Sequence, residues 1–232
     1  MEMGTLYIVA TPIGNMEDIT LRALRILGEA DIILCEDTRT TGKLLARHGI
    51  KAKKYASYNA HSTKGKSDFI LEALKEGKSV ALVSDAGTPG ISDPGTLLVR
   101  QVRDVFGAEA KIVSVPGASA ITAAFSISGI SAAPFTFHGF VPHKKGRETL
   151  FKEIAEAKNY THVAYESSHR ILKALASLAN VLSDDRKVLI GRELTKMHEE
   201  MLEGTAQELH DLLTKHPVKQ KGEFVLIVAA SV

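Results

Sequence analysis

The stretch Ser84-Asp85-Ala86-Gly87-Thr88-Pro89-Gly90-Ile91-Ser92-Asp93-Pro94-Gly95 indicates how this chain folds. It follows an apolar run at residues 79–84 that has the length and the Val and Leu content of a buried strand. It precedes a helical pattern that contains Leu97, Leu98 and Val102. A strand, a glycine-rich loop and a helix in this order are typical of an α/β unit, in which parallel strands are covered by helices on both faces.

The same alternation of strands and helices extends in both directions from this loop. Strand-like runs precede it at residues 5–10 and 31–35, and another follows it at residues 111–115. In the second half of the chain, strands are predicted at residues 135–140, 161–165, 187–191 and 223–229. The Pro116-Gly117 step between the halves is the expected boundary. It predicts an N-terminal α/β domain over residues 1–116 and a C-terminal α/β domain over residues 117–232.

The composition is that of a soluble globular protein without a strong charge bias. The chain has 232 residues, 44% of them apolar, and 29 Lys plus Arg against 27 Asp plus Glu, which leaves a net charge of +2. This excludes a polycation, so any binding of nucleic acid requires a local basic patch. The single cysteine, Cys35, excludes an internal disulfide and indicates a reducing compartment. The N-terminus lacks the layout of a signal peptide, and we therefore expect a cytoplasmic protein.

The residues from Ile112 to His143 include no Asp, Glu, Lys or Arg, which is long enough to raise the question of a membrane-spanning segment. Prolines and glycines interrupt this run, and its Ala and Ser residues outnumber the large aliphatic ones. Such a segment inserts poorly into a bilayer. We therefore expect a buried helix of small residues here and no membrane partner.

Several common enzyme classes lack their motifs in this sequence. The turn Thr11-Pro12-Ile13-Gly14-Asn15 has one glycine where a dinucleotide-binding fold or a Rossmann-type methyltransferase has a glycine-rich turn. No G-x-x-x-x-G-K-[ST] segment occurs, and Gly117-Ala118-Ser119-Ala120-Ile121 is one glycine short of a nucleophile elbow. The nine histidines form no H-E-x-x-H pair, so no metal site is expected.

Two loops at strand ends are candidate small-molecule sites. The loop at residues 84–95 is expected at the carboxyl edge of the sheet, where open α/β proteins bind ligands. Its glycines let backbone groups approach a ligand, and Asp85 can accept hydrogen bonds from an amine or from ribose hydroxyls. The alternative is a loop that only connects a strand to a helix. Residues 116–120 suit a cofactor at a helix N-terminus, and dense packing between domains explains the same small residues nearly as well.

Three further blocks at strand ends carry ionisable side chains. Glu36-Asp37-Thr38-Arg39 suits proton handling, but a helix cap explains it as well, and on sequence alone we favour the cap. Residues 165–170 hold acid–base candidates, whereas a surface salt-bridge cluster explains residues 192–200 equally well. The basic cluster at residues 143–147 can contact phosphates, although most such runs are solvated helix faces.

Taken in order, these blocks resemble the tetrapyrrole methylase superfamily, and the resemblance runs from Leu6 to Val228. The matching blocks are residues 9–15, 35–39, 84–95, 115–120, 165–170 and 192–196. The resemblance implies two α/β domains, with a mostly parallel sheet in the first and a mixed sheet in the second, and S-adenosylmethionine in the cleft between them. Within the superfamily, the blocks are most similar to bacterial enzymes that methylate the ribose 2′-oxygen of a cytidine in small-subunit ribosomal RNA. The resemblance further implies that the protein is a homodimer and that it acts on the assembled small subunit.

The resemblance also implies which residues form the site. It places cofactor contacts at Pro12, Ile13, Gly14, Asp85, Gly87, Thr88, Ser119, Ala120, Tyr165, Leu194, Gly222 and Glu223. A ribose hydroxyl needs a base or an electrostatic partner before it attacks a methyl group, and the candidates are Asp37 and Glu166 as bases, with Arg39 or Lys196 as the cation. RNA contacts are expected from Lys144, Lys145, Arg147, His169 and Arg170.

Two alternatives stay open on the same residues. One is a methylase of a small tetrapyrrole or of a protein side chain, although the basic clusters favour RNA over a porphyrinoid. The other is a non-catalytic, RNA-binding ribosome-assembly factor that holds the cofactor only structurally.

Overall fold

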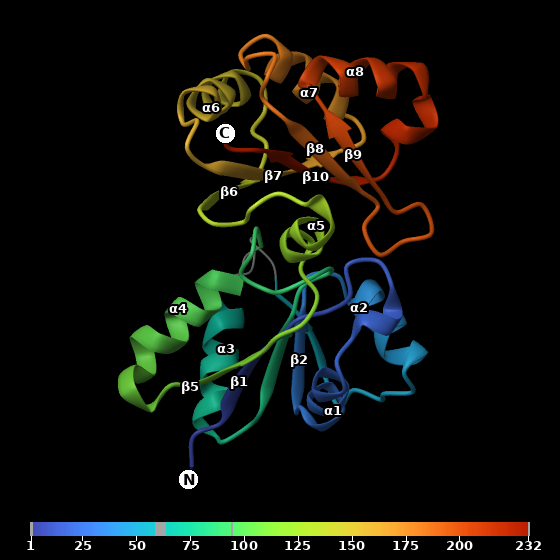
Figure 1. The fold of residues 1–232 in the computed structure, drawn as a ribbon. Coiled ribbons are helices and arrows are strands. Elements are labelled where there is room, and N and C mark those ends of the chain that lie inside the picture. The colour runs from blue at the N-terminus through green and yellow to red at the C-terminus, as the bar shows by residue number, and fades with distance from the viewer. Residues whose placement is uncertain (1, 59–63, 94, 232) are drawn as a thin grey trace. The chain divides into compact units, whose positions relative to one another are not determined.

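The computed structural model describes residues 2–58, 64–93 and 95–231, so Pro94 of the glycine-rich loop lies outside the described residues. The chain divides into two compact units, Met1–Ser119 and Ala120–Val232 (Figure 1). The sequence analysis placed this division at Pro116-Gly117. Each unit has its own sheet and its own core, so each is described by itself.

The sheet of the first unit is parallel throughout, with the strand order β3-β2-β4-β1-β5 among the described residues. Its strands are β1 (Thr5–Val9), β2 (Ile32–Cys35), β3 (Tyr55–Ser57), β4 (Val80–Val83) and β5 (Lys111–Val115). Its helices are α1 (Leu21–Glu29), α2 (Thr38–Arg47), α3 (Lys64–Lys75) and α4 (Gly95–Phe106), with the short 3-10 turns η1 (Met16–Asp18) and η2 (Gly107–Glu109). Every residue of β2 and β4 is buried, as expected for central strands covered on both faces.

Two apolar clusters cover the two faces of this sheet. Alternate residues of a strand point to opposite faces, so Leu6 of β1 joins α3 and α4 on one side while Val9 joins α1 and α2 on the other. Leu98 and Val102 of α4 belong to the first cluster, and Leu27 of α1 belongs to the second. The predicted parallel α/β architecture is therefore confirmed.

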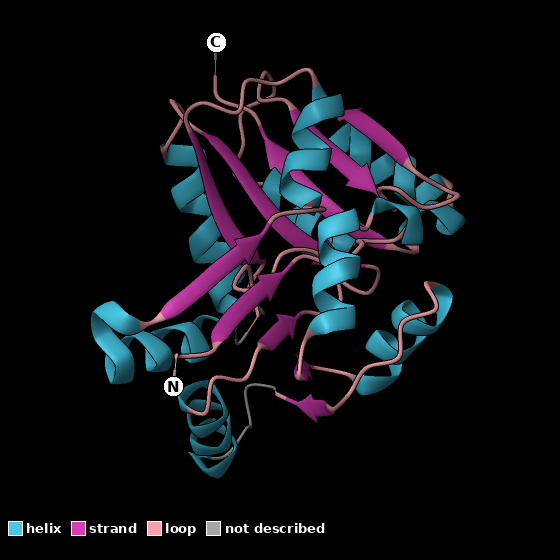
Figure 2. Ribbon diagram, turned by 90° about the horizontal axis from the view of Figure 1, so that it is seen from below, coloured by secondary structure: helices cyan, strands magenta, loops and turns pink. Residues whose placement is uncertain are grey.

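The second unit contains a mixed sheet in the order β6-β7-β10-β8-β9 among its described residues. β6 (Phe135–Phe140) and β7 (Thr161–Ser167) are parallel, whereas β8 (Val188–Arg192), β9 (Glu200–Gly204) and β10 (Glu223–Val228) pair antiparallel. The helices are α5 (Ala120–Ser128), α6 (Lys145–Glu156), α7 (Ile171–Ala179) and α8 (Ala206–Lys215), with the 3-10 turn η3 (Pro217–Gln220). Figures 1 and 2 show these helices around the strands of the sheet.

The core of the second unit lies between one face of this sheet and α6, α7 and α8. Phe151 of α6, Leu175 of α7 and Leu213 of α8 are all fully buried in it, together with Leu226 of β10. The other face of the sheet contacts α5 through β8, β9 and β10. The mixed sheet implied by the resemblance is confirmed.

The sequence analysis missed two strands, and both are edge strands. β3 has three residues, too few to show an alternating pattern, and it follows a lysine-rich stretch. β9 carries two glutamates and has no fully buried residue, so it has the composition of a polar loop. Edge strands are half exposed, and polar residues there conceal the strand pattern.

The uncharged run from Ile112 to His143 comprises most of β5, the helix α5 and the strand β6, rather than one helix. Only Ile121, Ala124 and Ser128 of α5 are buried, and Ile127 is 49% exposed. The expected buried helix is therefore wrong, because α5 contacts its sheet along one side only. Among the described residues, none of the helices combines the length and apolarity needed to cross a membrane.

Asp31 connects the starts of two central strands of the first unit. Its Oδ2 accepts hydrogen bonds from the backbone N–H and the hydroxyl of Ser79, at 2.9 and 2.8 Å, and its Oδ1 lies 2.9 Å from Nζ of Lys53. The hydrogen bond from Lys53 and those from Ser79 lower the pKa of Asp31 to about 2. The ionised carboxylate therefore stabilises the folded state.

We expect Asp31→Asn to lower the free energy of unfolding by about 1 kcal/mol at pH 7, because solvent screens a side chain that is 38% exposed. The pKa of Asp31 is depressed from an unfolded value of about 3.9, so this contribution is present above that value and lost as the pH falls toward about 2. Urea unfolding from pH 7 to pH 2 measures it. A difference between wild type and variant that does not shrink below pH 4 would contradict this account.

Candidate active site

Four loops follow the carboxyl ends of neighbouring strands in the first unit. They are residues 11–15 after β1, 36–37 after β2, 84–93 after β4 and 116–119 after β5, and the strands are adjacent in the order β2-β4-β1-β5. Parallel strands end at the same edge of a sheet, so these loops lie side by side although up to about a hundred residues separate them. Such an edge is where open α/β proteins bind ligands.

Hydrogen bonds hold three of these loops together. The backbones of Thr11 and Gly87 exchange two hydrogen bonds, of 2.9 and 3.0 Å, and the hydroxyl of Thr11 donates to the carbonyl of Ser84 at 3.1 Å. The hydroxyl of Thr88 donates to the carbonyl of Ala118 at 3.2 Å. The structure therefore brings together the segments that contain the predicted cofactor residues Pro12, Ile13, Gly14, Gly87, Thr88 and Ser119.

Gly87 is a position of this arrangement that has both a positive φ and close neighbours. Its φ of +80° lies in the region that favours glycine, and a Cβ atom would lie 3.3 Å from Cγ2 of Ile13 and 3.7 Å from the carbonyl oxygen of Ala118. A side chain at this position strains the backbone and presses on the loop after β1. The glycine is thus needed for the close approach of the three loops.

Asp85 and Asp37 lie at the neighbouring strand ends. Oδ1 of the exposed Asp85 accepts a hydrogen bond from the backbone N–H of Asp37 at 3.1 Å. Asp37 in turn caps α2, with its Oδ1 accepting from the N–H of Arg39 at 2.8 Å. The favoured sequence interpretation of this block as a helix cap is confirmed.

Asp37 and Arg39 also form an ion pair, with Nη2 and Oδ2 2.6 Å apart. The hydrogen bond from the Arg39 side chain, with that from its backbone, lowers the pKa of Asp37 to about 2. Asp37 is therefore ionised at neutral pH but weakly basic. Its predicted catalytic role and that of Arg39 stay predictions.

Glu36 belongs to the block considered for proton handling, but it was not named among the catalytic candidates. Burial, and then the negative charges of Asp85 and Asp93, raise the pKa of its carboxyl. Glu36 directly follows β2, and this position at a strand end was the available signal. Its neighbours come from the β4 loop, so only the folded structure shows why its basicity exceeds that of Asp37.

The second unit brings the loop after β8 against the start of β10. Two hydrogen bonds join Glu193 and Glu223. The backbone N–H of Glu193 donates to the Glu223 carbonyl at 3.0 Å, and the backbone N–H of Glu223 donates to the side-chain Oε1 of Glu193 at 2.8 Å. Gly222 has φ +121°, and a Cβ atom there would lie 2.5 Å from Cγ of Glu193. The predicted cofactor residues Leu194, Gly222 and Glu223 are therefore in one place.

Lys196 lies between the two acids of this loop. Its Nζ is 2.8 Å from Oε1 of Glu193 and 2.8 Å from Oε2 of Glu223. Burial disfavours the charged ammonium, but the two carboxylates outweigh it and raise the pKa of Lys196. Lys196 thus stays a cation, which suits an electrostatic partner and not a base.

Tyr165 is on β7, opposite Val225 of β10. Its ring packs edge-on against Phe137 and Phe140, with centroids 4.9 and 5.4 Å apart. Burial raises the pKa of its hydroxyl to about 12, so the Tyr165 side chain is uncharged at neutral pH. Ala120, the remaining predicted cofactor residue of this unit, begins α5.

The predicted RNA-binding residues surround the start of α6 and of α7. Lys144, Lys145 and His169 are exposed, whereas Arg147 and Arg170 are partly buried. Arg170 donates from Nη1 to the carbonyl of Val141 at 2.8 Å. The structure therefore brings these two blocks together, although about twenty residues separate them.

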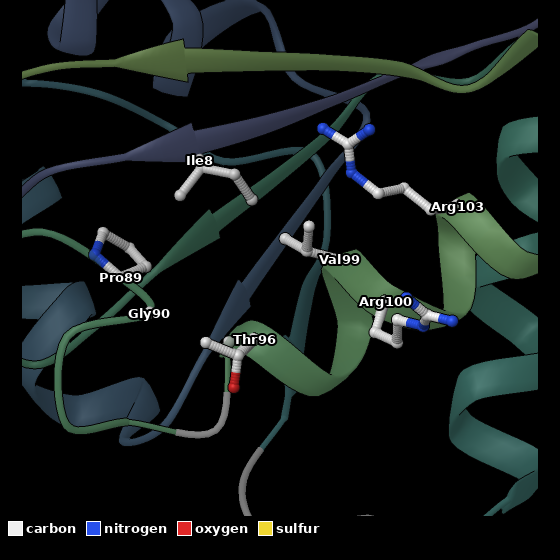
Figure 3. A pocket seen from close by; sticks show the side chains of 8 residues that line it. Ile8, Pro89, Gly90, Thr96, Val99, Arg100 and Arg103 are labelled. Carbon is white, nitrogen blue, oxygen red and sulfur yellow. The ribbon is translucent and has the colours of Figure 1, made fainter. Parts of the chain in front are cut away.

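A cavity of about 380 Å³ opens on the other side of the glycine-rich loop, between β1 and α4 (Figure 3). It is lined by Ile8, Pro89, Gly90, Gly95, Thr96, Val99, Arg100 and Arg103. None of the predicted cofactor residues lines it, so the cavity and the predicted contacts use different parts of the same loop. Among the described residues, no group of three or more His, Cys, Asp or Glu side chains could hold a metal ion.

Residues 5–210 match the family described as Tetrapyrrole (Corrin/Porphyrin) Methylases, and this chain belongs to that family. Among curated relatives, it is 46% identical to the "Ribosomal RNA small subunit methyltransferase I" of Haemophilus influenzae over 97% of this chain and 78% of that protein. The protein of the same name from Escherichia coli O157:H7 is 45% identical, over 97% and 77%, and that from Synechocystis sp. is 42% identical, over 99% and 80%.

Solved structures share the fold at low sequence identity. The methyltransferase CobJ superposes with a TM-score of 0.70 at 18% identity, over 98% of this chain and 95% of that one. Cobalt precorrin-4 methyltransferase (CbiF) gives a TM-score of 0.66 at 20% identity, over 97% and 94%. The two-sheet architecture is therefore that of tetrapyrrole methyltransferases.

The family uses S-adenosyl-L-methionine as its methyl donor, and so does this chain. The residues present fit that molecule. Three loops approach one another closely at Gly87, and the exposed carboxylate of Asp85 beside them is able to accept from an amine or a hydroxyl. Its binding is proposed at the predicted residues.

We expect Gly87→Ala to weaken S-adenosylmethionine binding about tenfold, because about 1–2 kcal/mol of backbone strain falls on the loop that is predicted to contact it. Isothermal calorimetry measures the dissociation constant. Gly107→Ala is the matched control, since Gly107 has φ +52° but nothing within 4 Å of a Cβ atom. Equal affinity in the two variants would contradict the assignment of this loop.

Proposed function

We propose that this protein transfers a methyl group from S-adenosylmethionine to the ribose 2′-oxygen of a cytidine in small-subunit ribosomal RNA, acting on the assembled subunit in the cytoplasm. The observation that carries the proposal is the identity of 42–46% with relatives named as small-subunit ribosomal RNA methyltransferases, over nearly the whole chain. The tetrapyrrole methyltransferases of known structure are only 15–20% identical. Those neighbours therefore support the fold alone.

When bound, S-adenosylmethionine supplies a methyl group on a positively charged sulfur. The chain's own contribution is to orient the ribose hydroxyl and to stabilise the charge that develops on its oxygen. We assign the hydroxyl-orienting role to Asp37, which is ionised and accepts hydrogen bonds. The cationic role falls to Arg39, whose side chain is 85% exposed, or to Lys196, which its two carboxylates keep charged.

The basic residues at the start of α6 and α7 are proposed to bind RNA phosphates. Lys144 and Lys145 are exposed cations, and Arg147, His169 and Arg170 are beside them. With a net charge of only +2 on the whole chain, this local concentration is what favours an anionic polymer. It also argues for RNA rather than a porphyrinoid as the substrate.

Small subunits isolated from a strain lacking this protein are the substrate for the decisive assay. We expect a labelled methyl group from S-adenosylmethionine to appear on the 2′-oxygen of a cytidine, identified by mass spectrometry of the released nucleosides. Free ribosomal RNA and a tetrapyrrole are offered in parallel. Label on a base, on a ribosomal protein or on the tetrapyrrole would overturn the proposal, and calorimetric binding of the donor without any turnover would indicate the non-catalytic assembly factor.

We also propose that the chain forms a homodimer through the edge of the second sheet. β6 is an edge strand whose Phe135 and Phe140 are 42% and 55% exposed, and Ile127 of α5 is 49% exposed. An exposed apolar edge strand favours pairing with another chain. In a dimer with twofold symmetry, this edge pairs with the same edge of a second copy of the chain.

Light scattering is expected to give about 50 kDa, twice the 25.1 kDa of the chain. Phe135→Lys places a charge on this edge and is expected to shift the mass toward 25.1 kDa. Val218→Lys, at a residue that is 74% exposed on η3, is the control. A dimer that survives Phe135→Lys would exclude this edge as the interface.

A further inference from the structure

Glu166 is the most deeply buried acid of the second unit's candidate site. Its side chain has no exposed surface. Oε1 accepts a hydrogen bond from the Ser167 N–H at 2.8 Å and lies 2.8 Å from Nε of Arg170, whereas Oε2 is buried without a hydrogen-bond partner among the described residues. Burying an ionised carboxylate costs desolvation free energy unless cationic groups lie nearby to offset it. The residues around Glu166 therefore show how its burial is tolerated.

Side chains from two segments act on this carboxylate. Arg170, directly before α7, forms the ion pair with it, and Arg147 lies in the first turn of α6. Burial raises the pKa of Glu166, and the hydrogen bond from the Ser167 N–H and the charges of Arg170 and Arg147 oppose that rise. Glu166 therefore pairs with Arg170 of one predicted RNA-binding block and is influenced by the charge of Arg147 of the other.

The two arginines keep part of their surface exposed. The Arg170 side chain is 19% exposed and Arg147 is partly buried, although Nε of Arg147 is itself buried without a hydrogen-bond partner among the described residues. Arg170 is held by Glu166 and by the Val141 carbonyl, and its Nη1 is 3.4 Å from Nε2 of His143. Among the described residues Glu166 pairs with Arg170 alone, so the charge of Arg147 is left for a phosphate to neutralise.

The backbone beside this cluster is strained. Lys144 has φ +47°, a left-handed conformation that is unfavourable for a residue with a side chain, and its side chain does not cap α6. Its carbonyl accepts from the N–H of Arg147 at 3.0 Å. Strain of this kind persists only where surrounding contacts impose it, and it occurs most often at binding sites.

A base must come within about 3 Å of the hydroxyl it deprotonates, and the fully buried side chain of Glu166 has no surface for a ribose to contact. We propose that Glu166 is instead a positioning residue, which holds Arg170 in the orientation that binds an RNA phosphate. The inference rests on the proposed function, because it concerns how the proposed RNA contacts are built.

The test is steady-state methylation of small subunits by the full-length protein carrying Glu166→Gln. Glutamine has nearly the same shape but no charge, so the Arg170 guanidinium loses its ion pair. We expect KM for subunits to rise about tenfold, the slope of log KM against log salt to fall by about one, and kcat to change less than about threefold. Affinity for S-adenosylmethionine, measured by calorimetry, should stay that of the wild type.

Three companion variants interpret the result. Glu166→Asp keeps the charge and should recover part of the loss in KM, which a purely structural role would not require. Glu156→Gln removes an exposed acid from the same unit, at the end of α6, and should change nothing. Lys144→Ala with Lys145→Ala tests the proposed RNA contacts directly and should raise KM.

The outcomes separate the inference from the proposed function. If the double lysine variant raises KM and Glu166→Gln does not, the RNA contacts stand and Glu166 does not position them. A fall in kcat of a hundredfold or more at unchanged KM in Glu166→Gln would make it a base and overturn the inference. If the double lysine variant changes neither KM nor its salt dependence, the proposed RNA contacts fail. If Glu166→Gln does not fold, Arg170→Ala removes the positioned guanidinium instead, and a wild-type KM for subunits in that variant would overturn the inference.

Discussion

Parallel pairing of β1 with β4 and β5 is the constraint on which the first unit depends. It aligns the carboxyl ends of strands that are far apart in the sequence, and the exchange of two backbone hydrogen bonds between Thr11 and Gly87 then joins their loops. Gly87 adopts a positive φ there, and a Cβ atom would lie 3.3 Å from Cγ2 of Ile13. Loops fixed by backbone hydrogen bonds form a rigid edge, which suits the alignment of a displacement reaction if the methyl donor binds there as proposed.

Side-chain ion pairs fix the candidate site of the second unit, whereas backbone hydrogen bonds fix the loops of the first. Its ionisable side chains do not act singly, since Lys196 is shared by two glutamates and Glu166 is paired with Arg170. Each pairing holds a long side chain in one orientation. Such ordering favours binding of an anionic ligand, because the entropy of fixing arginines and lysines is lost on folding rather than on binding.

Much of this architecture was readable from the order of apolar runs, glycines and helix patterns. The parallel first sheet and the mixed second sheet follow from the strand–helix alternation and from the family resemblance, and both are present. The unrecognised strands β3 and β9 are short or polar edges, where burial is too slight to impose a pattern. The helix α5 was expected to be buried because its residues are small, but small residues also suit a helix that contacts its sheet on one side only.

The local pattern of residues was sufficient for the class of fold and for the position of each candidate loop, because strand ends and glycine turns depend on neighbouring residues in the chain. The pairing of the charged groups required the folded coordinates. Asp37 becomes a weak base through Arg39, Glu36 becomes a stronger one through burial and through Asp85 and Asp93, and Glu166 is paired with Arg170. Coulomb energies and desolvation depend on distance and burial in space, and neither quantity is encoded in spacing along the sequence.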